Sequence, residues 1–338
     1  MSARPRVFVA QWMPTAGTDR LAAHCALDLS GSLGPLPREE LLARSSRADA
    51  MVAFVSDYVD AELVEQAPSL RVVASFGKGF DNIDVAACTR RGVLVTINPE
   101  ALTESTADLA LGLILAACRN VAAGDRHVRS GRFHGWHPTD LLGREFHGSA
   151  LGIVGFGAIG QAIARRASAF DARITYFDPV RRPEAESRLN VSYRDFGDLL
   201  AGSEIVVLAA DLRLANRHLL GREAIGRMKP GALLVNVGRG SLVDEAAVAD
   251  SLATGALGGF AADVFEFEDE SIPERPRSIH PALLARADAT VFTPHLGTGT
   301  VAARDRLAVS TAEQLLAALG GEIPSGAVNP AVARGVTG

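Results

Sequence analysis

The chain alternates short apolar runs with longer amphipathic stretches, and this alternation limits the possible folds more than any other feature. Such runs fit buried parallel strands, and the stretches between them fit helices that cover both faces of a sheet. The pattern therefore predicts an α/β protein with two doubly wound parallel sheets. The expected strands are Val7–Ala10, Met51–Val55, Val72–Ser75 and Val93–Thr96, then Leu151–Gly155, Arg173–Phe177, Ile205–Ala209, Ala232–Val237, Gly259–Val264 and Thr290–Thr293.

Two long helical stretches set the expected domain boundaries. Residues Thr103–Cys118 are apolar on nearly all sides and begin with hydroxyl and acidic residues, so we expect a helix buried at a domain or subunit interface. A second helix is expected over Val301–Leu319, ending at Gly320–Gly321. Because no strand-bearing domain has room after it, this helix should fold back onto the N-terminal domain. The expected domains are residues 1–101 with 299–330, and residues 102–298.

Composition excludes several other classes of protein. The 338 residues are 48% hydrophobic and 22% charged, which is ordinary for a chain that buries full cores. The net charge of -5 and the scattered Lys and Arg residues argue against a nucleic-acid partner. The three cysteines, Cys25, Cys88 and Cys118, lack CxxC spacing and predict buried thiols, neither disulfides nor a metal site.

The sequence gives no sign of export or membrane insertion. Arg4 and Arg6 precede only the apolar stretch Val7–Ala10, which is too short for the core of a signal peptide. No later apolar run reaches the length needed to span a membrane. We therefore expect no membrane partner and a cytoplasmic location.

A glycine-rich turn after the strand at residue 151 predicts a dinucleotide site. Gly155, Gly157 and Gly160 form a GxGxxG motif between an apolar strand and an amphipathic helix, where free N–H groups bind a pyrophosphate. The next strand ends in Asp178, whose carboxylate suits the adenosine ribose hydroxyls and repels the extra phosphate of NADP. NAD is the expected cofactor. NADP is the alternative, because Arg181 and Arg182 follow in the same loop.

Three polar residues follow later strands of the same sheet, where the catalytic groups of open α/β proteins lie. Arg239 follows residues 232–237, Glu268 follows 259–264, and His295 follows 290–293. Hydride transfer from a small anion needs a cation to bind the anion, a base, and a carboxylate to orient that base. Each also has a structural interpretation when it is taken alone. Arg239 fits a turn residue, Glu268 fits an acidic surface run, and His295 fits a helix-capping or buried histidine. Together they predict a dehydrogenase site.

The segments GFGAIG, NVGRGSLVDE, AADVFEFED and FTPHLG resemble the D-isomer-specific 2-hydroxyacid dehydrogenase family over essentially the whole chain. The resemblance implies a Rossmann NAD-binding domain inserted into a flavodoxin-like substrate domain, and a homodimer. It also implies that Arg239, Glu268 and His295 are catalytic. The implied cofactor-binding residues are Gly155, Gly157, Ala158, Ile159, Gly160, Asp178, Val237, Gly238 and Asp263, with Asp263 facing the nicotinamide carboxamide.

Within that family the chain resembles phosphite (phosphonate) dehydrogenases, through RVVASFGKGFDNIDVAACTRRGV, VRSGRFHGWHP and RPRSIHPALLA. This resemblance implies that Lys78 and Gly79 bind the substrate oxyanion, and that Trp136 reaches the pocket from the partner subunit. A loop lysine exposed to solvent is the alternative for Lys78. The chain departs from the phosphite pattern at three pocket positions, Val55, Gly77 and Leu141. Because Val55 and Gly77 are smaller than the residues of that pattern, a wider pocket is expected.

Three functions follow as hypotheses. The first is oxidation of phosphite to phosphate, with Lys78 and Arg239 binding the oxyanion and His295 acting as base beside Glu268; Arg239 is the alternative base. The second is interconversion of a 2-keto acid and a D-2-hydroxy acid, which can carry a phosphonate, by the same residues. The third is an NADH-sensing corepressor that binds peptides, which the lysine loop and the absence of interaction tails disfavour.

Overall fold

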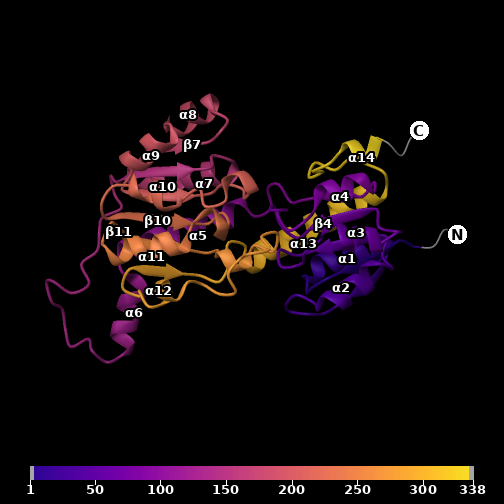
Figure 1. The fold of residues 1–338 in the computed structure, drawn as a ribbon, viewed down its shortest axis with the longest axis horizontal. Helices are drawn as coiled ribbons and strands as arrows, with labels where there is room; N and C mark the ends of the chain where they lie inside the picture. Colours follow the sequence, from indigo (N-terminus) through magenta and orange to yellow (C-terminus); the bar gives the residue numbers. More distant parts are fainter. Residues whose placement is uncertain (1–3, 335–338) are drawn as a thin grey trace. The chain divides into compact units, whose positions relative to one another are not determined.

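A computed structural model describes residues 4–334, and these divide into two compact units (Figure 1). Unit 1 comprises Met1–Leu102, Asp269–Pro273 and Thr298–Gly338, as far as they are described, and unit 2 comprises Thr103–Glu268 and Glu274–Gly297. The chain therefore enters unit 2 after its first hundred residues and returns to unit 1 at the end. Each unit is built on its own parallel sheet.

Unit 1 has a five-stranded parallel sheet in the order β2-β1-β3-β4-β5, which is the flavodoxin-like order. The strands are β1 Arg6–Val9, β2 Ala26–Leu29, β3 Ala50–Ala53, β4 Val72–Ser75 and β5 Leu94–Thr96. The helices are α1 Thr15–His24, α2 Arg38–Ser45, α3 Ala61–Gln66, α4 Val85–Arg90, α13 Val301–Leu319 and α14 Ala331–Arg334. As predicted, α13 folds back onto the N-terminal strands: it packs on α1 and β4, and a Cβ at Gly17 would lie 2.6 Å from the Ala308 carbonyl oxygen.

Unit 2 has a seven-stranded parallel sheet in the order β12-β11-β10-β9-β6-β7-β8. Its strands are β6 Ala150–Val154, β7 Arg173–Phe177, β8 Ser192–Tyr193, β9 Ile205–Leu208, β10 Ala232–Asn236, β11 Leu257–Ala262 and β12 Thr290–Phe292. Its α-helices are α5 Thr103–Cys118, α6 Val121–Arg129, α7 Ala158–Ala167, α8 Pro183–Leu189, α9 Phe196–Gly202, α10 Arg222–Gly226, α11 Glu245–Ala253 and α12 Pro281–Leu284. The winding direction reverses between β6 and β9, which is where open sheets of this type bind ligands.

The sheet of unit 2 is covered on both faces. Successive residues of a strand point to opposite faces of the sheet, so they enter different cores. Leu233 and Val235 lie in one core, and Leu234 between them lies in the other. Helix α5 begins and ends where the sequence predicted, and its apolar residues, including Leu113 and Ile114, join the first of these cores. The burial of α5 is thus accounted for within unit 2.

Two strands were missed by the sequence prediction, β2 in unit 1 and β8 in unit 2. Both lie at a sheet edge, and neither is fully buried. An edge strand needs no continuous apolar run, and β8 has only the two residues Ser192 and Tyr193. The apolar pattern therefore carried no signal for either strand.

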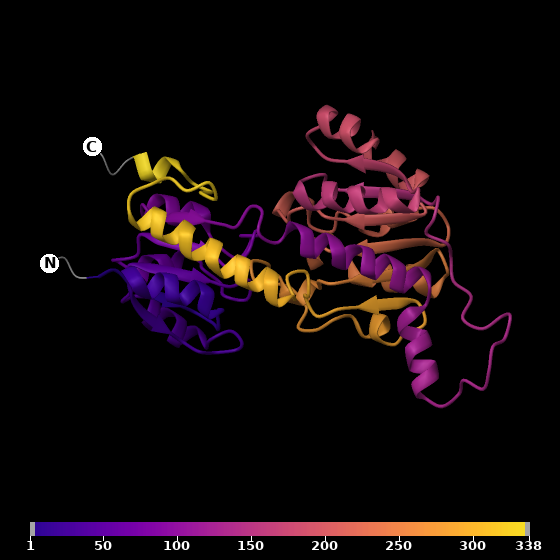
Figure 2. The ribbon, with the colours of Figure 1, turned by 180° about the vertical axis from the view of Figure 1, so that it is seen from behind.

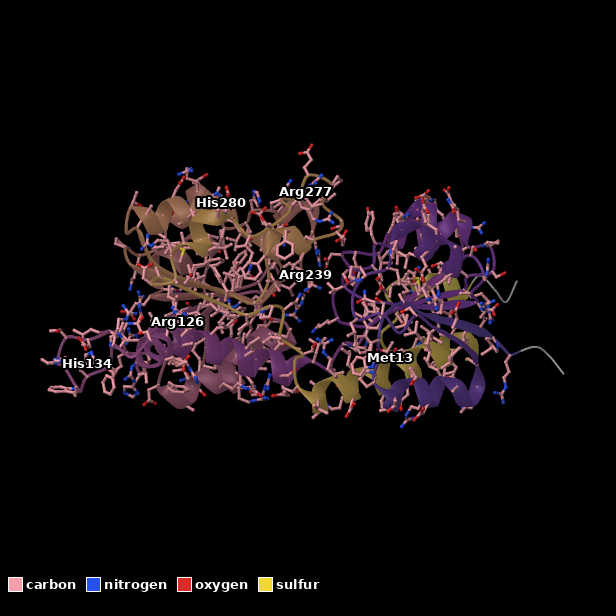
Figure 3. All side chains as sticks on the ribbon, turned by 90° about the horizontal axis from the view of Figure 1, so that it is seen from below. Met13, Arg126, His134, Arg239, Arg277 and His280 are labelled. Carbon is pink, nitrogen blue, oxygen red and sulfur yellow. The ribbon has the colours of Figure 1, made fainter. Side chains whose placement is uncertain are left out.

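An extended segment of unit 2, residues 121–145, was also not predicted, and we call it the arm. It consists of α6 and the irregular loop after it, which stand away from the sheet of unit 2 (Figure 2). Helix α6 has no buried residue, and Trp136 in the loop is 82% exposed. Figure 3 labels Arg126, which donates to the Ala287 carbonyl at 2.8 Å, and His134 near the far end of the arm.

The three cysteines are free and buried, as predicted from their spacing. Burial raises the pKa of the Cys88 thiol to about 12 and that of Cys118 to about 11. Among residues 4–334, no single helix has the length and hydropathy needed to cross a membrane. The bent pair of α5 and α6 meets those two criteria together.

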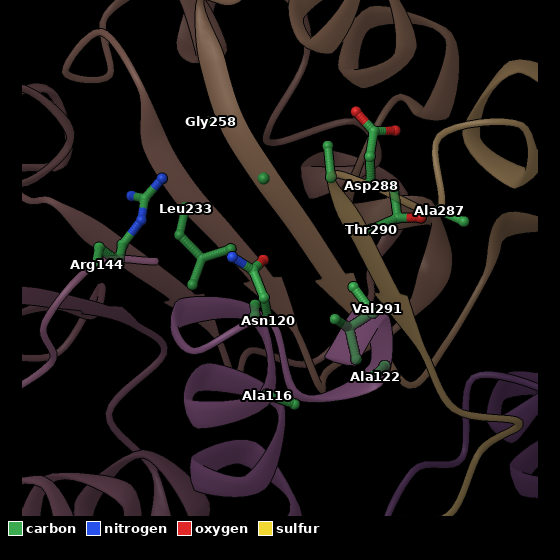
Figure 4. Close-up of a pocket in the computed structure, with 14 residues that line it drawn as sticks. Ala116, Asn120, Ala122, Arg144, Leu233, Gly258, Ala287, Asp288, Thr290 and Val291 are labelled. Atoms are coloured by element: carbon green, nitrogen blue, oxygen red, sulfur yellow. The ribbon is translucent and has the colours of Figure 1, made fainter. Parts of the chain in front are cut away.

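A cavity of about 40 Å³ lies at the amino ends of the last strands of unit 2 (Figure 4). Leu233, Gly258 and Thr290 mark the starts of three strands around it, and Asn120 and Arg144 line another side. Catalytic sites of parallel sheets lie at the opposite, carboxyl ends of the strands. We therefore assign this cavity no part in the chemistry.

Candidate active site

The three predicted catalytic residues follow three adjacent strands of unit 2 at their carboxyl ends. Arg239 follows β10 and precedes the short helix η3 Gly240–Leu242. Glu268 ends the short helix η4 Glu266–Glu268 after β11, and His295 follows β12. Because β10, β11 and β12 are neighbours in the sheet, residues far apart in the chain come to one edge.

His295 and Glu268 form a direct pair. Nδ1 of His295 lies 2.8 Å from Oε2 of Glu268, and the other carboxylate oxygen accepts the Phe265 N–H at 2.8 Å. The side chains are 31% and 22% exposed, so the pair is partly shielded and still accessible. A carboxylate at Nδ1 fixes the orientation of the ring and leaves Nε2 as the nitrogen that can exchange a proton with a substrate.

The backbone of His295 is strained, with φ at 55°. A non-glycine residue in this left-handed region costs roughly 1 to 2 kcal/mol. Asp263 holds the turn in place: its carboxylate accepts the N–H groups of Leu296 at 2.6 Å and Gly297 at 2.8 Å, and the Thr293 hydroxyl at 2.6 Å. The His295 N–H also donates to the Asp263 carbonyl at 2.9 Å. The turn is thus fixed at several points.

Asp263 therefore has a role that the sequence did not indicate. It was expected to face the nicotinamide carboxamide, yet the structure uses its carboxylate to shape the turn that carries His295. Burial is the main reason why the pKa of Asp263 is raised, and the hydrogen bonds it accepts oppose this. Contact between Asp263 and the cofactor stays a prediction.

The Arg239 loop is fixed from below by Asn236, the last residue of β10. The Asn236 amide donates to the Arg239 carbonyl at 2.8 Å, and its oxygen accepts the Gly238 N–H at 3.1 Å. A Cβ at Gly240 would lie 1.8 Å from the Phe265 carbonyl carbon, so only glycine fits there. The loops that carry Arg239 and Glu268 are therefore in backbone contact (Figure 3 labels Arg239).

A second set of carboxylates supports η4, and sequence reasoning missed it. The Glu245 N–H donates to the Glu266 carboxylate, and the Glu266 N–H donates to Glu245, each at 3.0 Å. His218 lies 2.8 Å from Glu266, and burial raises the pKa of Glu245. These bonds tie η4, and so Glu268, to the start of α11. The sequence signal was weak, because Glu266 lies in an acidic run typical of a surface.

The glycine motif forms a turn that fits a dinucleotide. Gly155 has φ at 90°, and a Cβ there would lie 2.6 Å from the Ala210 nitrogen after β9. A Cβ at Gly160 would meet the Gly155 carbonyl at 2.2 Å, whereas one at Gly157 would meet nothing within 4 Å. Gly157 directly precedes α7, whose first residues are Ala158 and Ile159. Open space before a helix N-terminus is what a pyrophosphate needs.

Asp178 follows β7 and is joined to the glycine turn. Its carboxylate accepts the Phe156 N–H at 2.8 Å and the Val180 N–H at 2.9 Å, which leaves acceptor capacity for ribose hydroxyls. Val237 and Gly238 follow β10, and a Cβ at Gly238 would lie 2.8 Å from the Ala210 carbonyl oxygen. These residues therefore lie at the carboxyl edge, around the point where the winding reverses.

Lys78 and Gly79 belong to unit 1, in the loop that follows β4. The loop is pinned by the Ser75 hydroxyl, which donates to the Gly79 carbonyl at 3.0 Å, and by the Asn98 N–H, which donates to Gly77 at 2.8 Å. Lys78 is partly buried. Trp136 lies in the arm of unit 2. The substrate-binding roles of Lys78, Gly79 and Trp136 stay predictions.

A doubly wound sheet with a glycine turn at its switch point, and a histidine–carboxylate pair at the same edge, defines a nucleotide-dependent dehydrogenase. The family model described as "D-isomer specific 2-hydroxyacid dehydrogenase, NAD binding domain" matches residues 111–297. The chain is 40% identical over 335 residues to a glyoxylate reductase from Pyrococcus horikoshii, covering 98% of each protein. It therefore belongs to the D-isomer-specific 2-hydroxyacid dehydrogenase family and has its NAD-binding domain.

Two solved structures are similar along nearly the whole chain. One is a D-lactate dehydrogenase from Aquifex aeolicus complexed with NAD and lactic acid, with a TM-score of 0.83, 25% identity, and 96% and 98% of the two chains covered. The other is an NADPH-dependent glyoxylate/hydroxypyruvate reductase from Sinorhizobium meliloti in complex with NADP and malonate. Its TM-score is 0.83 at 27% identity, with 97% and 98% covered. Both confirm the two-domain α/β fold.

Proposed function

We propose that the protein reduces a short 2-keto acid, with glyoxylate as the first candidate, to the corresponding 2-hydroxy acid with NADH. The observation that carries this proposal is the His295–Glu268 pair at 2.8 Å, on the strand edge that also holds Arg239 and the glycine turn. The identity to glyoxylate reductases supports this substrate class. The second of the two dehydrogenase hypotheses is therefore favoured over phosphite oxidation.

The residues of unit 2 supply what such a reduction needs apart from the hydride, which NADH provides when bound. Addition of a hydride to the carbonyl carbon leaves negative charge on the carbonyl oxygen, and that oxygen must receive a proton. Protonated His295 donates it from Nε2, while Glu268 stabilises the imidazolium and holds the ring. The Arg239 guanidinium binds the carboxylate of the substrate and orients the carbonyl.

The residues that hold NAD are those of the glycine turn and its surroundings. Gly155, Gly157, Ala158, Ile159 and Gly160 receive the pyrophosphate at the start of α7. Asp178 accepts the ribose hydroxyls, and Val237 and Gly238 border the nicotinamide side. Lys78 and Gly79 add positive charge and backbone donors for the substrate anion.

The substrate proposal is tested by following the absorbance of NADH. Glyoxylate and pyruvate are supplied with NADH, and phosphite is supplied with NAD in a parallel assay. We expect kcat/KM for glyoxylate to exceed that for phosphite by at least about 10²-fold, because Arg239 and His295 suit a carboxylate beside a carbonyl. Faster turnover of phosphite than of either keto acid would restore the phosphite hypothesis. If no acid is turned over and the protein instead binds peptides in an NADH-dependent manner, the corepressor hypothesis would be favoured.

We also propose that the arm joins two copies of the chain. Val121, Val128, Phe133, Trp136 and Leu142 are exposed apolar residues of the arm, and a segment that exposes several large apolar side chains is typical of an interaction surface. A homodimer is what the family resemblance implies, and Trp136 is the residue expected to reach the partner.

Substitution of Trp136 by Glu tests the dimer. We expect the molar mass from light scattering to shift from that of a dimer to that of a monomer, with the dissociation constant of the dimer raised at least about 30-fold. The reason is that a tryptophan that becomes buried when two proteins bind is typically an energetic centre of the interface. The control is Leu214→Glu, since Leu214 is 83% exposed in unit 2 outside the arm. An unchanged mass for W136E, or an equal change for L214E, would contradict the proposal.

A further inference from the structure

The turn between β7 and α8 holds two arginines beside the predicted ribose site. Asp178 opens this turn and accepts the Phe156 N–H of the glycine loop, so the turn and the pyrophosphate loop are joined directly. Arg181 and Arg182 follow within the same turn, shortly after Asp178, the residue that we expect to bind the ribose. An arginine here is the natural partner of the 2′-phosphate that distinguishes NADP from NAD.

Arg181 is already bound by a carboxylate. Its Nε and Nη2 donate to Oε1 and Oε2 of Glu186 at 2.8 and 2.9 Å, which is a two-pronged guanidinium–carboxylate contact. The guanidinium carbon also lies 5.8 Å from the centre of the Tyr193 ring. The edge of the Arg181 guanidinium formed by Nε and Nη2 is therefore occupied by Glu186.

Glu186 is itself held in place. The Tyr176 hydroxyl donates to Glu186 at 2.8 Å and accepts the Arg182 N–H at 2.7 Å, and the Glu186 side chain is only 15% exposed. Hydrogen bonds from Arg181 and then Tyr176 lower the pKa of Glu186 to about 2, so the carboxylate is ionised at neutral pH. The Arg181 guanidinium is thus held in place by a carboxylate that is itself fixed and ionised.

We propose that Glu186 is a cofactor-specificity residue, which disfavours NADP relative to NAD by keeping the Arg181 guanidinium from a 2′-phosphate. Arg182 is exposed and forms no ion pair within residues 4–334, so no carboxylate holds its guanidinium as Glu186 holds that of Arg181. Glu186 acts through Arg181 and is a positioning residue.

The proposed role of Glu186 concerns the cofactor alone and not the acid that is reduced. It is therefore tested by the dissociation constants of NADPH and NADH, measured by fluorescence titration without substrate. Removal of the carboxylate in Glu186→Ala is expected to tighten NADPH binding about tenfold, the size of one charge-assisted hydrogen bond. NADH binding should change by less than about twofold, because NADH has no 2′-phosphate.

Three further variants separate release of Arg181 from other effects. In an Arg181→Ala background, Glu186→Ala should give no gain in NADPH affinity, because no guanidinium is left to release. Glu184→Ala removes an exposed carboxylate from the same helix and should give less than about a twofold gain. Glu186→Gln keeps the size of the side chain and should give a smaller gain of the same sign.

The outcomes are decisive in either direction. A gain for NADPH in E186A and E186Q that vanishes with R181A supports the proposal. A gain that persists with R181A, an equal gain in E184A, or no gain in E186Q while NADH binding is kept would each overturn it. If E186A loses NADH binding and E186Q keeps it, the E186A substitution has damaged the fold. The change in NADPH affinity of E186Q then tests the proposal.

Discussion

Replacing His295 by Ala is expected to lower kcat for glyoxylate reduction by about 10³-fold, within the range of a lost general acid. The structure leaves Nε2 as the free nitrogen of His295, because Nδ1 is paired with Glu268 at 2.8 Å. The dissociation constant of NADH should stay within about twofold, since the glycine turn is untouched. Added imidazole should restore part of the rate, which distinguishes a lost proton donor from a damaged fold.

Glu268→Gln is expected to have a smaller effect of the same kind, about 10²-fold on kcat. The amide keeps the size of the side chain but no longer stabilises an imidazolium at His295. In the H295A background the same change should lower kcat little further, because the two residues act as one unit.

The matched control for His295→Ala is His147→Ala, since His147 is an exposed histidine of unit 2. Wild-type turnover in H295A would remove His295 from the chemistry.

The second large effect is expected at Arg239. Substitution by Ala should lower kcat/KM for glyoxylate by about 10³-fold, because two charge-assisted hydrogen bonds to the substrate anion are lost. Most of this loss should be a higher KM for glyoxylate, with the dissociation constant of NADH unchanged. Steady-state rates over a range of glyoxylate concentrations separate kcat from KM.

Lysine at position 239 should recover only part of the activity, about tenfold over Ala, because an ammonium keeps the charge without the planar fork. Arg222→Ala serves as the control, since Arg222 is an exposed arginine paired with Asp250 on the surface of unit 2. A KM for glyoxylate that stays at the wild-type value in R239A would rule out anion binding by Arg239.

The sequence predicted the elements whose signal is local. Helices α5 and α13 begin and end where expected, because their signals act over a few residues: an apolar run after hydroxyl residues for α5, and the Gly320–Gly321 stop for α13. The glycine turn before α7 was predicted for the same reason. The edge strands β2 and β8 and helix α6 were not, since none of them buries a full apolar face.

The choice of substrate shows a second limit of the sequence pattern. Resemblance at the Lys78 loop and around Trp136 suggested phosphite, whereas the glyoxylate reductases match the chain over 335 residues. Short segments record local chemistry, and Val55, Gly77 and Leu141 already departed from the phosphite pattern there. Substrate choice depends on the size and charge of a pocket that many segments build together.

The amino-acid order alone determined the class of fold and the identity of the candidate catalytic residues, because strand periodicity and the positions just after each strand are local properties. Tertiary structure alone decided that Asp263 holds His295 in a left-handed conformation, and that Glu186 binds Arg181. Backbone strain at His295 is offset by the carboxylate of Asp263, which directly follows the neighbouring strand β11 and holds the turn in place. Such contacts exist only once the sheet has formed.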